Sequence, residues 1–112
     1  MAIEFNGKTI ETTPMGYLAN QEDWSKELAE FMADQEGIKL TDKHWDLMNY
    51  LRDEFLNNAG NQPNTRHILK AMSDKWGKSL VQKDIYDLFP KDPSKQGGRI
   101  AGLPESRRKG GY

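Results

Sequence analysis

The chain begins with a short alternation of apolar and polar positions. Ile3 and Phe5 alternate with polar residues, the pair Asn6-Gly7 follows, and an equally alternating run comes after it. Asn-Gly suits the two central positions of a type I′ turn, because both positions require positive φ. The pattern therefore predicts a β-hairpin over residues 2–13, which must pack on helices because a lone hairpin is marginally stable.

Beyond this hairpin, apolar residues recur at helical spacing in four stretches. We expect helices over about 22–36, from the N-cap Thr41 to about 58, over about 64–76 and over about 80–89. The residues predicted to face the core are, in chain order, Trp24, Leu28, Phe31, Met32, Trp45, Leu47, Met48, Leu51, Phe55, Leu56, Ile68, Ala71, Met72, Trp76, Val81, Ile85, Leu88 and Phe89. The fold class is therefore mainly α with a small N-terminal hairpin.

The third and fourth helices are separated by a short turn at Gly77. Ser79 and Gln82 have the spacing of an S-x-x-Q capping box, which predicts that the fourth helix begins at about residue 80. Two short helices joined by a glycine-containing turn are typical of a helix-turn-helix.

One further helix is predicted near the end of the chain, where Asp92-Pro93 forms a start signal. Gly97 and Gly98 would each weaken it by about 1 kcal/mol relative to Ala. We therefore expect a short, frayed helix, with the residues past Leu103 mobile because none of the last eight is aliphatic.

Length and composition narrow the class of protein. A chain of 112 residues with 29% charged residues is one globular domain. No apolar run approaches the roughly 20 residues that span a bilayer, and the first residues lack the features of a signal peptide. We therefore expect a cytoplasmic protein with no membrane contact. The chain has no cysteine, which excludes disulfides and thiolate metal sites.

Charge is distributed unevenly along the chain. Residues 1–60 hold five basic and twelve acidic residues, a net charge of −7, whereas residues 61–112 hold eleven and five, a net charge of +6. This asymmetry is either a chance feature of a solvated surface or the sign of a basic half that meets an acidic partner or a nucleic acid.

Candidate catalytic and metal-binding residues are few. His44 and His67 have no partner at metal-ligand spacing, and no serine lies in a nucleophile-elbow sequence. Gly97-Gly98 is not part of a phosphate-binding loop. The sequence predicts neither an enzyme nor a bound cofactor or metal.

DNA binding through the helix-turn-helix is an alternative, because a recognition helix needs polar or basic side chains that reach bases and phosphates. Asp84 and Asp87 share the outer surface of the fourth helix and would repel phosphate. The residues that would carry nucleic-acid binding are Arg66, Lys70, Lys75, Lys78 and Lys83.

The end of the chain carries a specific string of residues. It consists of Leu88-Phe89-Pro90, Pro93, Lys95-Gln96, Arg99 and Ile100-Ala101-Gly102-Leu103-Pro104. Together with motifs such as Gly16-Tyr17-Leu18 and His44-Trp45, this string resembles the DsrC/TusE family of small sulfur-relay proteins, which include the gamma subunit of dissimilatory sulfite reductase. The resemblance implies an orthogonal helical bundle over 1–103, with a flexible C-terminal arm that ends in a mobile tail over 104–112.

The resemblance also implies a place in sulfur metabolism. TusE-type members pass persulfide sulfur towards tRNA thiolation, and DsrC-type members insert the arm into sulfite reductase. This implies protein partners from a sulfur-transfer or sulfite-reductase system. The residues implied to dock on them are Lys95, Arg99, Ile100, Gly102, Leu103 and Pro104.

The family's chemistry needs cysteine, and the two family cysteines correspond to Gly98 and Lys109 in this chain. Only a thiolate attacks a persulfide, and only sulfur can hold the transferred atom. We therefore expect a non-transferring paralogue with a binding or regulatory role, and a helix-turn-helix DNA-binding regulator as the alternative.

Overall fold

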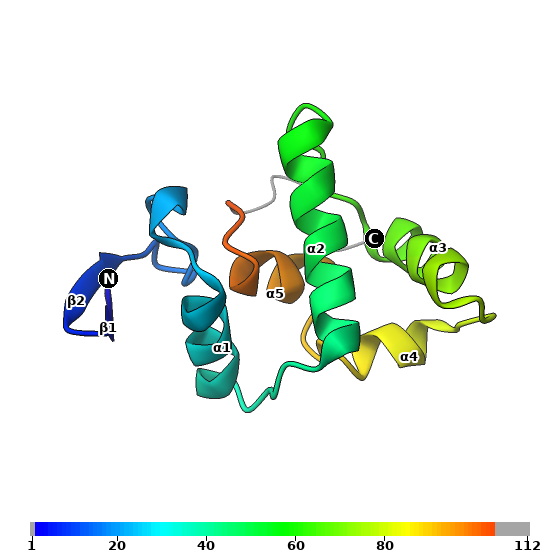
Figure 1. Ribbon diagram of the computed structural model, residues 1–112, viewed down its shortest axis with the longest axis horizontal. Coiled ribbons are helices and arrows are strands. Elements are labelled where there is room, and N and C mark those ends of the chain that lie inside the picture. The colour runs from blue at the N-terminus through cyan, green and yellow to red at the C-terminus, as the bar shows by residue number, and fades with distance from the viewer. Residues whose placement is uncertain (1, 105–112) are drawn as a thin grey trace.

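The structure is a computed structural model that describes residues 2–104, and it consists mainly of helices (Figure 1). The elements are β1 (Ala2–Phe5), β2 (Lys8–Glu11), the 3-10 helix η1 (Gln21–Asp23), α1 (Lys26–Gln35), α2 (Asp42–Asn57), α3 (Thr65–Trp76), α4 (Gln82–Tyr86) and α5 (Pro93–Ile100). The mainly helical fold with a small hairpin is confirmed.

The short helix α5 lies in the middle of this arrangement, between α1 on one side and α3 and α4 on the other (Figure 1). The helices α1, α2 and α3 all pack on it. The prediction of a frayed helix is therefore wrong. Intrinsic propensity is a weak signal, and packing of α5 against three other helices overrides the cost of its two glycines.

Gly97 explains how α5 approaches its neighbours so closely. A Cβ atom at this position would lie 3.3 Å from Leu51 Cδ1 and 3.4 Å from Leu47 Cδ2 and Phe89 Cδ2. Gly97 weakens the helix in isolation. Because it has no Cβ atom, however, Leu47, Leu51 and Phe89 can pack directly against the backbone of α5.

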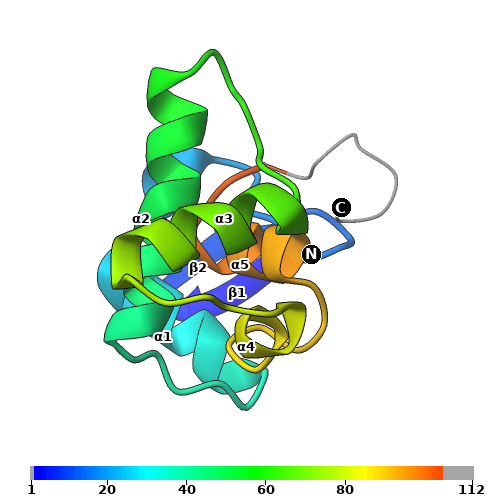
Figure 2. The same cartoon turned by 90° about the vertical axis from the view of Figure 1, so that its right-hand side faces the viewer.

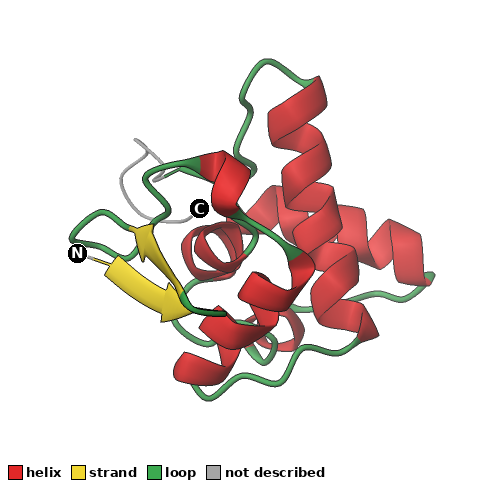
Figure 3. Ribbon diagram, turned by 60° about the vertical axis from the view of Figure 1, so that its left-hand side comes forward, coloured by secondary structure: helices red, strands yellow, loops and turns green. Residues whose placement is uncertain are grey.

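The N-terminal hairpin forms as predicted (Figure 3). The two strands are antiparallel, with Ile3 opposite Ile10, and the turn residues Asn6 and Gly7 both have positive φ, 51° and 75°. The hairpin packs on α1, where the rings of Phe5 and Phe31 are 5.2 Å apart.

The first helix begins later than the sequence predicts. Trp24 is extended, with φ −72° and ψ 141°, and the residues before it form only the 3-10 turn η1. The N-cap of α1 is Ser25, whose Oγ accepts a hydrogen bond from the N–H of Leu28 at 3.1 Å. The two long helices keep their predicted starts, with Thr41 as the N-cap of α2 and Asn64 as the N-cap of α3.

The capping box predicted at Ser79 and Gln82 does not form. Helix α4 begins at Gln82, and the carboxylate of Asp84 accepts the N–H of Val81 at 2.9 Å. This later start turns Val81 to the surface, where it is 61% exposed, and Leu80 packs against the core instead.

One core contains side chains from every α-helix. Its largest fully buried apolar side chains are Phe89, Leu28, Leu47, Met48, Leu51, Ile68, Met72, Ile85 and Ile100. Leu56, which was predicted to widen the buried face of α2, is 61% exposed. None of the described helices is long and apolar enough to cross a membrane.

Candidate functional site

The segment Ile100–Pro104, here called the arm root, is fixed to the domain by side chains that bind its backbone. Trp24 donates from Nε1 to the carbonyl of Ile100 at 2.9 Å. Arg52 on α2 donates to the carbonyl of Ala101 at 2.8 Å. The arm is therefore held through its main chain by two residues that lie 76 and 49 positions away in the sequence.

A third donor fixes the last described residue. Gln62 donates from Nε2 to the carbonyl of Pro104 at 2.8 Å. Within the arm, the N–H of Leu103 donates to the carbonyl of Gly98 at 2.9 Å, and the Leu103 side chain is 2% exposed. The side chains of Trp24, Arg52 and Gln62 together are called the clamp below.

Within the clamp, the Arg52 guanidinium lies over the Trp24 ring, with its carbon 3.9 Å from the ring centroid. Burial lowers the pKa of Arg52, because a charged group loses water when it is covered. The ring face and the Ala101 carbonyl replace part of that hydration.

Gly102 allows the arm root to pass over Trp24. Its φ is +81°, and a Cβ atom there would lie only 2.4 Å from Cγ and Cδ1 of the Trp24 ring. Both the backbone conformation and the close contact therefore require glycine at this position.

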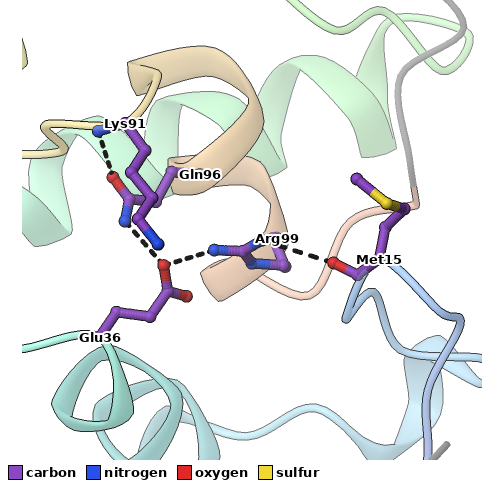
Figure 4. Close-up of polar contacts among 5 residues, drawn as sticks. All are labelled: Met15, Glu36, Lys91, Gln96 and Arg99. Atoms are coloured by element: carbon purple, nitrogen blue, oxygen red, sulfur yellow. Dashed lines mark hydrogen bonds and ion pairs between the residues drawn. The ribbon is translucent and has the colours of Figure 1, made fainter.

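A second polar network joins α5 to the end of α1 (Figure 4). Glu36, the C-cap of α1, accepts a hydrogen bond from Gln96 Nε2 at 2.7 Å and forms an ion pair with Arg99. Gln96 in turn accepts the backbone N–H of Lys91 at 3.0 Å, and Arg99 also points to the carbonyl of Met15. A carboxylate at a helix C-terminus is unfavourable alone, and the Arg99 charge compensates it.

This network borders an open groove of about 460 Å³ between the hairpin, α1 and α5. Ile3 and Glu4 of β1 line one side, and Phe31, Glu36 and Arg99 are among the residues that line the rest. Because the charges of Glu36 and Arg99 face each other, the groove presents no concentrated charge of either sign.

The residues expected to dock on partners have unequal exposure in this structure. Ile100, Gly102 and Leu103 are buried. Arg99 is held by Glu36, whereas Lys95 and Pro104 are half-buried. Of these residues, a partner can therefore reach Lys95, which lies on α5, and Pro104, which ends the arm root.

Gly98, one of the two cysteine-equivalent positions, lies on α5 beside a small cavity of about 10 Å³. A Cβ atom at this position would meet nothing within 4 Å. The cavity is also lined by Gln62, Lys95 and Pro104. The fold thus leaves room for a side chain at position 98. Lys109, the other equivalent position, lies outside the described residues.

The two histidines occupy different environments. His44 is 7% exposed; its Nδ1 accepts the N–H of Thr41 at 3.1 Å, so its Nε2 donates to the carbonyl of Leu88 at 2.9 Å. Desolvation by burial lowers the pKa of His44, and the bond to Leu88 partly opposes this. His67 is exposed. Within residues 2–104, no group of three His, Asp or Glu side chains is placed to hold a metal.

The candidate nucleic-acid residues Arg66, Lys70, Lys75, Lys78 and Lys83 are all exposed. Helix α4 is accessible, because only Ile85 is buried in it. However, Lys83 forms an ion pair with Asp87 at 3.0 Å, and Asp84 is exposed on the same helix. Helix α4 therefore presents carboxylates where DNA binding would need uncompensated positive charge.

Reasoning from sequence did not assign the roles of Trp24, Arg52 and Gln62. A usable signal was present for Arg52, because an arginine directly follows the core residue Leu51 on α2. No local signal was present for Gln62, which lies in a loop.

Comparisons with known proteins agree with this architecture. The model of the family "DsrC like protein" matches residues 4–108. The sulfurtransferase TusE of Yersinia pestis is 43% identical over 104 residues, which cover 92% of this chain and 94% of that protein. The oxidised gamma-subunit of the dissimilatory sulfite reductase (DsrC) from Archaeoglobus fulgidus has a TM-score of 0.86 at 32% identity, covering 97% and 99% of the two chains. The DsrC of Allochromatium vinosum has a TM-score of 0.83 at 38% identity, covering 96% of each.

An anchored C-terminal arm on a helical bundle with a small hairpin thus defines the class of protein. The chain belongs to the DsrC/TusE family of sulfur-relay proteins.

Proposed function

We propose that this chain is a non-transferring member of its family, which binds partners of a sulfur-relay system through its arm and regulates them. One observation carries this proposal: the arm root is anchored by the clamp and the core, while the chain contains no cysteine. The anchored part of the arm is thus present, but the chain lacks the atom that would carry sulfur.

The chemistry supports a binding role rather than a transfer role. A persulfide forms when a thiolate attacks the outer sulfur of another persulfide and releases the donor thiolate. Gly98 has no side chain, and the amine of Lys109 cannot form a sulfur–sulfur bond. Neither position can accept sulfur, so this protein is not expected to be an enzyme or a carrier.

The partner class follows from the relatives. One is named a sulfurtransferase and another is a subunit of a sulfite reductase. We propose that this chain occupies the docking surface that a cysteine-bearing relative uses and thereby competes with that relative. Lys95 on α5 and Pro104 at the end of the arm root then belong to the contact surface, and Arg99 and the buried arm residues keep the arm in its conformation.

A competition assay tests the proposal. Transfer of radioactive sulfur from a persulfidated sulfurtransferase to TusE would be followed while this chain is added in increasing amounts. We expect the transfer rate to fall with a saturating dependence on the added chain, and we expect the chain itself to stay unlabelled. An undiminished transfer rate in the presence of excess chain would contradict competition.

DNA binding is the second candidate, and it rests on the exposed cations Arg66, Lys70 and Lys75 of α3. A titration with duplex DNA at rising salt separates the two functions, because phosphate contacts weaken steeply with salt. No detectable binding at low salt would remove this candidate.

A further inference from the structure

We infer that the outer edge of β1 is a docking site for a short extended segment of a partner protein, which joins the hairpin as a third strand. The segment that fits this edge alternates basic and apolar residues. The edge is a second interaction surface of the molecule, because it lies on the hairpin and involves neither the arm root nor a thiol.

The backbone of β1 presents hydrogen-bonding groups along this edge. Phe5 and Lys8 flank the two-residue turn, and such a flanking pair shares hydrogen bonds. Bonded and non-bonded pairs alternate along an antiparallel ladder, so the N–H and C=O groups of Ala2 and Glu4 point away from β2. Within residues 2–104, no backbone hydrogen bond outside the helices and the hairpin involves Ala2 or Glu4. These groups are therefore available to another strand.

The opposite edge of the hairpin is already covered in part. The carbonyl of Glu11 on β2 points away from β1 and accepts the N–H of Ala19 at 3.0 Å, and Thr12 forms an isolated bridge with Leu18. In the described part of the chain, β1 pairs with β2 alone. It contains no proline, lysine or bulge, which are common features that prevent strand addition at an edge. Strand addition is therefore expected on the β1 side.

The open groove between the hairpin, α1 and α5 runs along this edge. Ala2, Ile3 and Glu4 all line it. Because successive side chains of a strand point to opposite faces, contact with all three residues places the groove beside the strand rather than over one face. In the view of Figure 2, the hairpin lies between α5 and α1, the two helices that contribute to the groove. Its volume of about 460 Å³ gives a third strand room beside β1.

The middle residue of the added segment should be apolar. Residues directly opposite each other on neighbouring strands point to the same face, so a residue opposite Ile3 shares a face with Ile3 and Phe5. This face turns towards α1, where the ring of Phe31 lies 5.2 Å from that of Phe5. Ile3 and Phe31 are both half-buried, and an apolar side chain between them would remove more of their surface from water.

The other face of the hairpin selects basic residues. Glu4 and Glu11 both lie on this face, and both are exposed. Neither belongs to an ion pair within residues 2–104, although the Glu4 carboxylate accepts the hydroxyl of Thr9 at 2.8 Å. The residues before and after the apolar one would point to this face. Since opposite charges on neighbouring strands attract, lysine or arginine fits both positions.

A second copy of this chain fits the edge less well than such a segment does. Two β1 strands paired antiparallel would bring Glu4 and Glu11 of both chains onto one face, where like charges weaken the pairing. The occupant is therefore a different protein. Its segment needs to be only about 13 Å long, because β1 has four residues.

The test uses the full chain and two blocked peptides of equal length. One peptide alternates lysine with valine, and the other alternates glutamate with valine. Binding would be followed by backbone amide chemical shifts and by amide hydrogen exchange.

Three variants accompany the wild-type chain. Ala2→Pro removes one outward N–H group at the first residue of the strand, a position that accepts proline. Glu4→Lys reverses the charge beside the groove. Asp74→Lys is the matched control, because it makes the same change of charge at an exposed residue of α3, which does not border the groove.

We expect the lysine–valine peptide to shift the amide signals of residues 2–5 and of Phe31, and to slow hydrogen exchange at Glu4. Its affinity should fall about fivefold in Ala2→Pro, which loses one hydrogen bond. Glu4→Lys should prefer the glutamate–valine peptide, because the charge on the hairpin is reversed. Asp74→Lys should bind both peptides as the wild type does.

Three results would overturn the inference. They are equal affinity of the wild type for the two peptides, an Ala2→Pro variant that binds as tightly as the wild type, and unchanged amide signals in residues 2–5. Shifts in β1 that depend on protein concentration in the absence of peptide would show that a second copy occupies the edge, and this would also overturn it.

Discussion

Gly98 and Gly102 lie only four positions apart, yet they differ sharply in the side chains that they tolerate. At Gly102, alanine would have to adopt a φ of +81° and push into Trp24. At Gly98, in the middle of α5, alanine would meet nothing within 4 Å. We therefore expect Gly102→Ala to lower the free energy of unfolding by about 2 kcal/mol or more, and Gly98→Ala to raise it by up to about 1 kcal/mol.

Urea denaturation of the two variants checks this prediction, with the wild-type chain as reference. A stable Gly102→Ala variant would show that the arm root does not lie on Trp24. A large loss of unfolding free energy in the Gly98→Ala variant would show that position 98 has no room for a side chain.

His44 provides a prediction for pH. The folded pKa of His44 is lowered below 6.5 by burial, so between the two values the unfolded state binds a proton that the folded state does not. Stability is therefore complete above pH 6.5 and falls as the pH drops from there towards the folded pKa. We expect His44→Gln to lose this contribution to the pH dependence, as measured by the thermal midpoint from pH 7.5 to 5.

The exposed His67 supplies the control. A His67→Gln variant should keep the fall in stability that the wild type shows, because its side chain is not part of the Thr41–Leu88 contact. If the His44→Gln and wild-type curves were parallel, the buried ring would not be the cause.

At the scale of elements, we expect the clamp to stabilise the arm root more than it stabilises the rest of the fold. Arg52→Met keeps an apolar stem but removes the donor to Ala101 and the cation over Trp24. We expect a loss of about 1–3 kcal/mol, with amide hydrogen exchange accelerated most in residues 100–104. Lys83→Met is the matched control, because its ion pair with Asp87 is exposed and contributes about 1 kcal/mol or less.

A uniform acceleration of exchange in the Arg52→Met variant would mean that Arg52 supports the whole fold. An unchanged exchange rate in the arm would mean that Trp24 and Gln62 suffice to hold it.

At the scale of the whole molecule, the absence of thiols predicts the result of exposure to a sulfur donor. Incubation with a persulfidated sulfurtransferase should leave the intact mass unchanged, since no side chain can form a persulfide. A Lys109→Cys variant is the positive control, and we expect it to gain the mass of one sulfur atom. A stable sulfur adduct on the wild-type chain would disprove the non-transferring role.

Two truncations distinguish the contribution of residues 105–112 to partner binding from the contribution of the arm root to stability. Ending the chain after Pro104 keeps the clamp and the buried arm residues, so we expect the thermal midpoint to stay near that of the full chain and partner binding to weaken. Ending it after Gly98 removes Ile100, Ala101 and Leu103 from the core, at a cost of several kcal/mol. We expect that shorter chain to be largely unfolded, as circular dichroism would show. A truncation after Pro104 that binds partners as well as the full chain would contradict docking through the tail.

The sequence alone determined the features that depend on neighbouring residues. The Asn6-Gly7 turn, the N-cap Thr41 and the long helices α2 and α3 follow from turn chemistry, capping and apolar periodicity. The resemblance to the family was carried by the arm motifs and is confirmed by the comparisons. The missing cysteines were equally plain from the sequence.

Only the tertiary structure decided what depends on distant residues. Local propensity described α5 as frayed, yet Gly97 lets it approach Leu47 and Leu51, and burial against three helices stabilises it. The clamp could not be predicted from the sequence either, because Arg52 binds a backbone carbonyl and a ring face that come together only after folding. Carbonyl groups have the same chemistry at every residue, so no sequence pattern shows which of them a distant side chain will bind.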